Sequence, residues 1–574
     1  ATAKPRATDR DATAVGFGGA VASVDPDATA IGLDVLRKGG NAADAAVAAA
    51  AALGVTEPYS AGIGGGGFFV HYDAAAGQVE TVDGRETAPM AMPSDAFINP
   101  DTGVPYPFFP DLVTSGVSVG VPGTPATWEA ALESWGTISF AQALKPSTQL
   151  AARGFVVDET FRAQTLQNAQ RFAAIEPTAE LFLPNGDAPA VGSIFRNPDL
   201  ADTYRLLAKE GPGALYEGEL AQEIVDAVQD PPVTPGTALP VPPGFMETSD
   251  LSAYAVRRPE PTLVSYRGLD VYGMAPPSSG GSTVGESLNI LEQFDLSGTT
   301  TDQALHNYLE ATALAFADRG KYLGDSDFVD VPLDEILSDG FAAERSCEID
   351  PDTAAPKPVA AGDADGDYVT TCDGPTAAGA EADNEGMSTT HLTVADRWGN
   401  VVAYTLTIEQ TGGSGITVPG RGFLLNNELT DFSAVFNPAD PNRIEPGKRP
   451  RSSMSPTIVL RDGEPWLAVG SPGGSMIITT VLQTLVNRVD LGMDLPEAIA
   501  APRASQRNTA SVAAEQAFID DFGPVLTPYG HTFSLSAEIG ATTGIEFLPD
   551  GSLLAAAEPE RRGGGAAGVV EPAE

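Results

Sequence analysis

Residues 384–431 read NEGMSTTHLTVADRWGNVVAYTLTIEQTGGSGITVPGRGFLLNNELTD, and this stretch decides the fold. Side chains alternate with period two over residues 388–395, the pattern breaks at residues 397–400, and alternation resumes over residues 401–408. Two alternating runs separated by a short turn predict a β-hairpin. Thr389 therefore stands at the beginning of the first strand.

A threonine in this place has an ordinary interpretation, because β-branched side chains suit a pleated surface. The preceding residues 373–386 are small, acidic and glycine-containing, which predicts an exposed and cleavable loop. If the bond between Ser388 and Thr389 were cut, Thr389 would carry both a hydroxyl and a free α-amine. An α-amine titrates near neutral pH and can take the hydroxyl proton without a histidine. The sequence therefore permits an N-terminal threonine nucleophile.

Six separated motifs extend this interpretation, because each resembles a segment of the γ-glutamyltranspeptidase family of N-terminal nucleophile hydrolases. They are GIGGGGF at Gly62, PPSSGG at Pro276, STTH at Ser388, GFLLNNELTDFS at Gly422, KRPRSSMSPT at Lys448 and GSPGGS at Gly470. The resemblance runs from about residue 19 to residue 568. It implies an α+β protein, a four-layer αββα sandwich. It also implies a precursor that cuts itself into a large subunit, residues 1–388, and a small subunit, residues 389–574.

Composition limits the classes of partner. The 574 residues carry a net charge of −45, so we expect no nucleic acid partner, since phosphates require clustered Lys and Arg. The acidity fits either adaptation to salt or the general solubility of an exported protein, and we favour the second. We expect no membrane span, because no apolar run reaches the ~18 residues that one needs.

Two features predict a secreted protein, extracellular or periplasmic. The chain opens on polar residues, as a mature protein does after its signal peptide has been removed. Its only two cysteines, Cys347 and Cys372, bracket one local loop, which predicts a disulfide formed in an oxidising compartment. Two free buried thiols are the alternative.

Near the N-terminus the sequence predicts two alanine-rich helices. Asp27 is expected to cap the first, which runs to about Arg37, and Asn41 with Asp44 in a capping box starts the second, which ends at Gly54.

The glycine-rich motif that follows formally matches the dinucleotide-binding pattern GxGxxG. It follows a helix and precedes a strand at residues 68–72, whereas a dinucleotide site needs strand, loop and then helix. We therefore interpret it as a tight turn where backbone approaches backbone.

The catalytic groups that the resemblance implies are few. Thr389 is the nucleophile and its α-amine the base, and Thr407 is the threonine that hydrogen-bonds the nucleophile and supports self-cleavage. A predicted strand, glycine turn and helix start over residues 466–486 would aim backbone N–H groups at one point, as an oxyanion requires. By resemblance the oxyanion hole is Gly473 and Gly474, whereas the residues alone also fit a plain tight connection.

The substrate pocket that the resemblance implies is polar. An isolated arginine is by default a surface charge, but DGRETAP at residues 83–89 resembles the family segment whose arginine holds the substrate α-carboxylate. A guanidinium suits this role because its fork pairs bidentately with a carboxylate. The implied substrate-binding residues are Arg85, Ser452 and Ser453 for the carboxylate, Glu428 and Asp431 for the α-ammonium, and Glu409. Glu409 stands where many relatives have asparagine, and it either tightens ammonium binding or marks a different acyl group.

Histidine chemistry is not indicated. The chain has four histidines, and no Ser-His-Asp arrangement or metal cluster stands out among them. His391 is conceivable as a base because it lies two residues from Thr389 on the same strand face, but we interpret it as a packed or hydrogen-bonded residue. We expect no cofactor and no metal.

The sequence therefore predicts an enzyme that cleaves γ-glutamyl amides such as glutathione through a γ-glutamyl-threonine ester. The acceptor is water or an amino acid or peptide, and the short connection from Asp431 to Ser452 favours water because it leaves little chain for a lid. Two alternatives stay open: a glutaryl-cephalosporin acylase of the same superfamily, and an acidic binding protein that never matures.

Overall fold

The computed structural model describes residues 10–369 and 388–573. Cys347 is disulfide-bonded in it. The predicted partner Cys372 and the predicted cleavable loop, residues 373–386, lie outside the described residues. The alternative prediction of a free thiol is therefore wrong for Cys347.

The core of the molecule is one large antiparallel sheet of 12 strands. In spatial order the strands are β3 (Gln78–Asp83), β2 (Gly66–Asp73), β9 (Val401–Thr407), β8 (Thr390–Asp396), β1 (Thr13–Ser23), β16 (Leu553–Ala557), β15 (Thr543–Phe547), β11 (Glu464–Gly470), β10 (Thr457–Arg461), β7 (Leu269–Gly273) and β6 (Thr262–Tyr266), with β17 (Ala566–Pro572) also paired to β1. The sheet folds back on itself, so that β8 and β9 contact β11 across the interior. The single hydrogen-bonded sheet thus supplies both inner layers of a sandwich.

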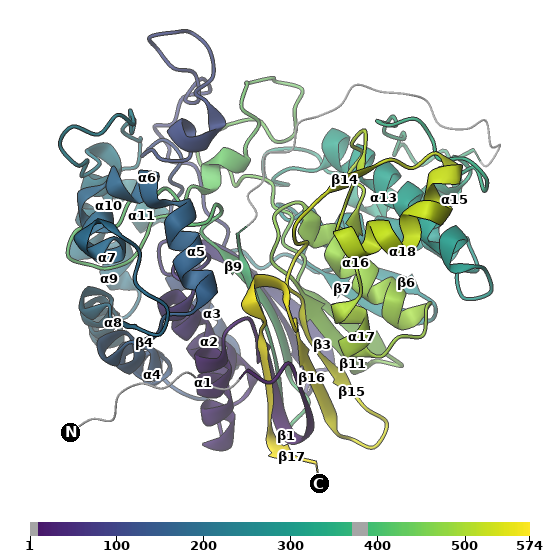
Figure 1. The fold of residues 1–574 in the computed structure, drawn as a ribbon, viewed down its shortest axis with the longest axis horizontal. Coiled ribbons are helices and arrows are strands. Elements are labelled where there is room, and N and C mark those ends of the chain that lie inside the picture. Colours follow the sequence, from purple (N-terminus) through teal and green to yellow (C-terminus); the bar gives the residue numbers. More distant parts are fainter. Residues whose placement is uncertain (1–9, 370–387, 574) are drawn as a thin grey trace.

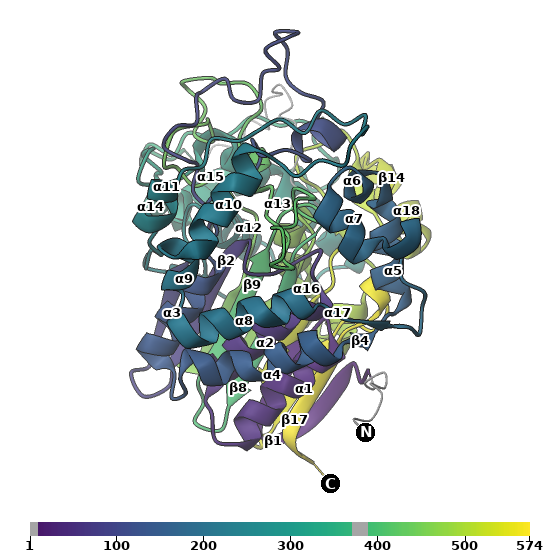
Figure 2. The same ribbon diagram turned by 90° about the vertical axis from the view of Figure 1, so that its left-hand side faces the viewer.

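Helices cover the two outer faces, as Figures 1 and 2 show. On one face α1 (Pro26–Arg37), α2 (Ala42–Thr56) and α3 (Thr124–Trp135) contact the sheet, and α4 (Phe140–Arg153) and α8 (Pro198–Glu210) pack outside them. On the other face lie α12 (Gly280–Glu292), α16 (Met476–Val489) and α17 (Leu495–Ala500), with α13 (Thr301–Tyr322) packed on α12. This arrangement confirms the predicted four-layer αββα sandwich.

Shorter elements complete the layers. The remaining helices are α5 (Glu159–Gln167), α6 (Ala169–Ala173), α7 (Glu176–Phe182), α9 (Gly213–Tyr216), α10 (Glu219–Gln229), α11 (Thr248–Ala253), α14 (Leu333–Ile336), α15 (Asp339–Ser346) and α18 (Gln516–Leu526). Small sheets join β4 (Phe155–Val156) to β5 (Ile194–Phe195), and β12 (Ala504–Ser505) to β13 (Val512–Ala514) and β14 (Phe533–Leu535). Within the described residues, no helix has the length and apolarity that crossing a membrane would take.

The two N-terminal helices form as predicted, with corrected ends. The cap of α1 is Asp25 rather than Asp27, because Asp25 Oδ1 accepts from the Ala28 N–H at 2.9 Å. The predicted capping box of Asn41 with Asp44 is confirmed, but α2 continues two residues past Gly54. Every residue of α2 is buried, and its small alanine side chains allow it to lie close to β8 and β9.

The predicted hairpin is confirmed as β8 and β9, paired so that Thr390 lies opposite Leu406. Thr389 therefore sits just before β8, next to the end of β9 at Thr407. The glycine motif is a close backbone approach, as predicted, because a methyl group at Gly65 would lie 2.0 Å from the Thr407 carbonyl oxygen. Glycine there lets β2 pair with β9 and brings the segment after β3 towards Thr389.

Candidate active site

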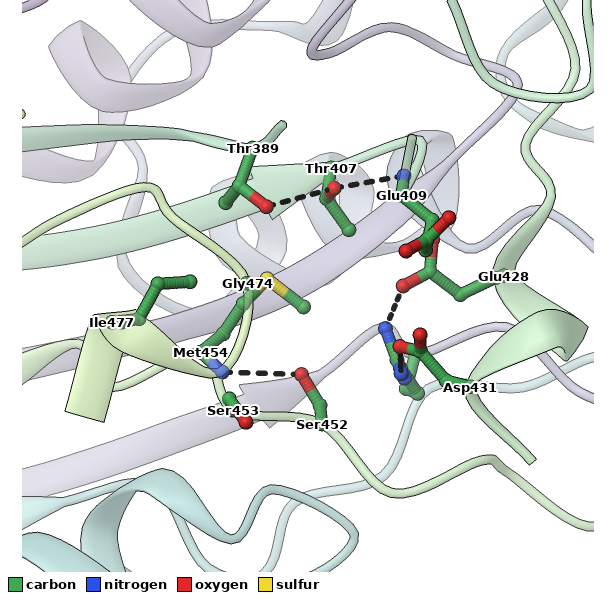
Figure 3. Close-up of a pocket in the computed structure, with 11 residues that line it drawn as sticks. Thr389, Thr407, Glu409, Glu428, Asp431, Ser452, Ser453, Met454, Gly474 and Ile477 are labelled. Carbon is green, nitrogen blue, oxygen red and sulfur yellow. Dashed lines mark hydrogen bonds and ion pairs between the residues drawn. The ribbon is translucent and has the colours of Figure 1, made fainter. Parts of the chain in front are cut away.

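The sequence-predicted site residues converge on one pocket (Figure 3). Its lining consists of Arg85, Thr389, Thr407, Glu409, Glu428, Asp431, Ser452, Ser453, Met454, Gly474 and Ile477. Every predicted catalytic or substrate-binding residue except Gly473 is in this set. Sequence analysis missed the two apolar members, Met454 and Ile477.

Thr389 presents its hydroxyl to this pocket in a fixed orientation. Its Oγ1 donates a hydrogen bond to Thr407 Oγ1 at 3.1 Å, and Thr407 Oγ1 also accepts from the Glu409 N–H at 2.9 Å. The backbone φ of Thr389 is +124°, a region that L-residues rarely adopt. Such a conformation costs about 1–3 kcal/mol and persists only where surrounding contacts hold it.

The charged end of the pocket is built around Arg85, whose side chain is only 1% exposed. The guanidinium forms ion pairs with Glu428 and with Asp431, the latter at 2.6 Å. It also donates to the carbonyl oxygens of Pro450 at 3.1 Å and Arg451 at 2.9 Å. The predicted carboxylate-binding cation and ammonium-binding anions are therefore paired with one another in this structure.

Glu428 retains capacity for a further partner. Within the described part of the chain, its Oε2 has no hydrogen-bond partner, although the side chain is buried. A buried carboxylate oxygen without a donor favours a cationic or N–H ligand at that point.

Glu409 lies beside the nucleophile and is held by its neighbours. Its carboxylate accepts hydrogen bonds from Asn427 Nδ2 and from Thr430 Oγ1. Burial lowers the pKa of Arg171 to about 10, and the carboxylate of Glu409 opposes this shift. Glu409 thus places a buried, hydrogen-bonded carboxyl group in the pocket wall.

Ser452 and Ser453 are supported by Ser279, which belongs to the PPSSGG motif, and by Arg319, which lies outside all six motifs. Ser279 Oγ donates to the Ser452 carbonyl oxygen at 2.7 Å. The buried Arg319, in the last turn of α13, donates to Ser279 Oγ and to Ser453 Oγ, each at 2.8 Å. No signal in the sequence pointed to Arg319. Its role follows from its burial in the structure, since arginine is almost never fully buried without partners.

Gly473 and Gly474 form the turn between β11 and α16, with φ of +136° and +58°. These values favour glycine, and they place the pair directly before the N-terminal end of α16. Backbone N–H groups at such an end attract negative charge. Gly474 lines the pocket, whereas Gly473 is not among its lining residues.

His391 is a packed residue, as interpreted from the sequence. Its ring nitrogens contact Thr405 Oγ1 at 2.8 Å and Thr393 Oγ1 at 3.1 Å rather than Thr389. Burial lowers its pKa to about 3, so the ring stays neutral at physiological pH.

One buried group of potential metal ligands, His306, Glu310 and His531, lies away from the pocket, although no such cluster stood out in the sequence. Both carboxylate oxygens of Glu310 accept from Lys357 Nζ, at 2.7 and 2.9 Å. His306 Nδ1 and His531 Nε2 are hydrogen-bonded to each other at 2.9 Å. Lys357 therefore already neutralises the carboxylate.

Comparison with known proteins agrees with this geometry. A profile of the family described as Gamma-glutamyltranspeptidase matches residues 28–569. The glutathione hydrolase proenzyme of Bacillus subtilis (strain 168) is 40% identical over 565 residues, 97% of this chain and 92% of that protein. The glutathione hydrolase proenzyme of Escherichia coli (strain K12) is 37% identical over 559 residues, 94% of this chain and 90% of that protein.

A solved structure is similar over the whole chain. The cephalosporin acylase from Bacillus halodurans superposes with a TM-score of 0.83 at 28% identity, covering 99% of this chain and 98% of that one. Fold and pocket together define an N-terminal nucleophile hydrolase. Within that class, the chain belongs to the γ-glutamyltranspeptidase family.

Proposed function

We propose that this pocket hydrolyses γ-glutamyl amides such as glutathione and transfers the γ-glutamyl group to water or to an amino acid or peptide. Family membership makes the chain a γ-glutamyl hydrolase and transferase. The observation that carries the assignment to this site is that the Thr389 hydroxyl and the ion cluster of Arg85, Glu428 and Asp431 open into the same pocket.

The enzyme first cuts itself between Ser388 and Thr389, giving chains 1–388 and 389–574. Thr389 Oγ1 bonds to the Ser388 carbonyl carbon, the C–N bond breaks, and the hydroxyl proton passes to the Thr389 nitrogen. Water then hydrolyses the resulting ester, leaving a carboxylate on Ser388 and a free amine on Thr389. The hydrogen bond to Thr407 supports this step because it orients Thr389 Oγ1. The strained φ of Thr389 supports it because cleavage of the bond releases that strain.

The mature site then performs acyl transfer. The Thr389 α-amine takes the hydroxyl proton while Oγ1 attacks the γ-carbonyl carbon of the substrate. The N–H groups of Gly473 and Gly474 stabilise the oxyanion. The amine leaves with the proton, and water or an acceptor amine opens the γ-glutamyl ester in a second attack.

Recognition uses the opposite charges of a glutamyl head group. Arg85, Ser452 and Ser453 hold its α-carboxylate, and Glu428 and Asp431 hold its α-ammonium. Among the described residues, Glu428 Oε2 has no hydrogen-bond partner, which supports this assignment because an ammonium brings three donors and no acceptor.

Intact mass under denaturing conditions tests the self-cleavage. The wild type is expected to give two chains, the smaller beginning at Thr389, whereas Thr389→Val gives one. Thr390→Val is the matched control, because Thr390 is the neighbouring buried threonine and its hydroxyl has no hydrogen-bond partner within the described chain. A wild type that stays in one chain would favour the binding-protein alternative.

The second candidate is a glutaryl acylase, which the similarity to a cephalosporin acylase favours. A glutaryl group lacks the α-ammonium, so processed wild type should cleave a γ-glutamyl anilide far faster than the glutaryl anilide. Equal rates would overturn the head-group assignment and favour the acylase.

We also propose that the protein is exported to the periplasm or the extracellular space. The disulfide at Cys347 supports this location, because disulfides persist mainly in oxidising compartments.

A further inference from the structure

A group of contacts to which the proposed mechanism gives no role lies at the bond that is proposed to break. The short 3-10 turn η5 (Arg561–Gly563) carries Arg562 to Thr389, where its Nη1 donates to the Thr389 carbonyl oxygen at 2.6 Å. Its Nη2 donates to Ser60 Oγ at 2.8 Å. Ser388 Oγ in turn bonds Ser60 Oγ at 3.0 Å and donates to the Tyr59 carbonyl oxygen at 3.1 Å.

One guanidinium therefore holds both residues of the Ser388–Thr389 bond, directly on the Thr389 side and through Ser60 on the other. We propose that Arg562 is a positioning residue for self-cleavage. It fixes the peptide so that Thr389 Oγ1 faces the Ser388 carbonyl carbon. This assignment rests on the proposed function, because it concerns the maturation of that site.

The backbone at Arg562 supports a role beyond packing. Its φ is +55°, so Arg562 and its partner Thr389 are both non-glycine residues in rarely populated backbone regions. Such conformations are unfavourable for L-residues, and they cluster at functional sites. A surface turn without a specific task would be more stable with glycine at this position.

The surrounding structure holds Arg562 in this unfavourable conformation. Thr160 Oγ1 donates to its carbonyl oxygen at 3.1 Å, and its N–H donates to Glu538 Oε2 at 3.1 Å. The adjacent Arg561 is anchored by an ion pair with Glu515 at 2.5 Å. These contacts fix the backbone and leave the guanidinium to reach Thr389.

The Arg562 guanidinium lies beside a carboxylate, and its side chain is only 14% exposed. Glu57 Oε2 lies 3.5 Å from its Nη2, and the pKa of Glu57 is raised by burial while Arg562 opposes that shift. A charged donor makes a hydrogen bond to a carbonyl about twice as strong as a neutral one. The Thr389 carbonyl is therefore held firmly while the bond before it is rearranged.

The test compares self-cleavage rates of unprocessed wild type, Arg562→Gly and Arg562→Lys by intact mass over time, together with urea unfolding. Glycine relieves the positive φ but removes the guanidinium. We expect Arg562→Gly to cleave at least tenfold more slowly with undiminished stability. Arg562→Lys should recover part of the rate, and millimolar guanidinium ion should partly rescue the glycine variant.

Arg267→Gly is the matched control, because Arg267 also has a positive φ of 52° and pairs with Asp490 and Glu292, outside the pocket. It should cleave at the wild-type rate. A wild-type cleavage rate in Arg562→Gly, or equal slowing in both glycine variants, would overturn the role of Arg562 and leave the proposed function standing. A wild type that never cleaves would overturn the proposed function itself.

Discussion

Replacing Arg85 by lysine tests the head-group pocket most directly. The guanidinium makes two ion pairs and two hydrogen bonds to carbonyl oxygens, and it is almost completely buried. Lysine keeps the positive charge but presents its three donors from one nitrogen, so it cannot pair with a carboxylate through a planar fork. The change therefore isolates geometry from charge.

The magnitude follows from the number of lost contacts. A hydrogen bond to a charged group contributes about 1.5–3 kcal/mol, and Arg85→Lys forfeits at least one in the substrate complex. We expect KM for a γ-glutamyl anilide to rise about 10- to 100-fold, since 1.4 kcal/mol corresponds to a factor of ten. The catalytic constant kcat should change little, because the α-carboxylate is held equally in ground state and transition state.

The assay measures kcat and KM on processed protein, with urea unfolding in parallel. Arg345→Lys is the control: Arg345 is equally buried and pairs with Asp318 at 2.9 Å and with Glu348, but it does not line the pocket. Both variants should lose stability by about 1–3 kcal/mol, and only Arg85→Lys should raise KM. An unchanged KM in Arg85→Lys would refute the assignment of Arg85 to the substrate carboxylate.

Four further changes test single parts of the site. Glu428→Gln should slow γ-glutamyl anilide cleavage and speed glutaryl anilide cleavage, because it removes a buried negative charge that pairs with an α-ammonium and repels a glutaryl carboxylate; a comparison of kcat/KM detects both changes. Thr407→Val should slow self-cleavage about tenfold by removing one hydrogen bond to the nucleophile, measured by intact mass. Gly474→Ala should lower kcat about 100-fold by displacing an oxyanion donor, at unchanged KM. Through His391, the wild type should lose about 1.4 kcal/mol of unfolding free energy for each pH unit below pH 6.5, and His391→Asn should not show this loss; urea unfolding measures both.

The sign of the last prediction follows from the depressed pKa of His391. The unfolded chain binds a proton near pH 6.5, whereas the folded ring resists it down to about pH 3. The contribution of His391 is fully present above pH 6.5 and is lost as pH falls towards 3. Other buried groups titrate equally in both proteins and cancel from the difference. A difference in unfolding free energy that is flat from pH 7 to pH 5 would contradict this reasoning.

Local patterns predicted the elements around the site well. The β8–β9 hairpin and the capping box of α2 depend on residues near one another in the chain, so periodicity and cap chemistry suffice. The errors were also local: Asp25 and Asp27 are both plausible caps of α1, and only the backbone conformation selects Asp25.

The pocket itself could be predicted only through the family resemblance. Arg85 and Glu428 are 343 residues apart, and no local pattern brings them together. Arg319 and Arg562 were missed because neither falls in one of the motifs that carry the family resemblance, although Arg562 directly precedes the glycine run at residues 563–565. In the folded protein their long side chains reach Ser453 and Thr389 from distant elements, which sequence spacing does not reveal.

The internal pairing of Arg85 gives a physical reason why this pocket should prefer γ-glutamyl to glutaryl groups. A zwitterionic head group brings one anion for Arg85 and one cation for the carboxylates that Arg85 releases, so each buried charge exchanges one partner for another. A glutaryl carboxylate would compete for Arg85 and supply no cation, which leaves Glu428 or Asp431 buried beside an additional anion. An uncompensated buried charge costs about 3–5 kcal/mol, enough for a discrimination of more than 100-fold. Efficient cleavage of a glutaryl amide would therefore require Glu428 to bind a proton or to leave the pocket, and its rate should then rise as pH is lowered.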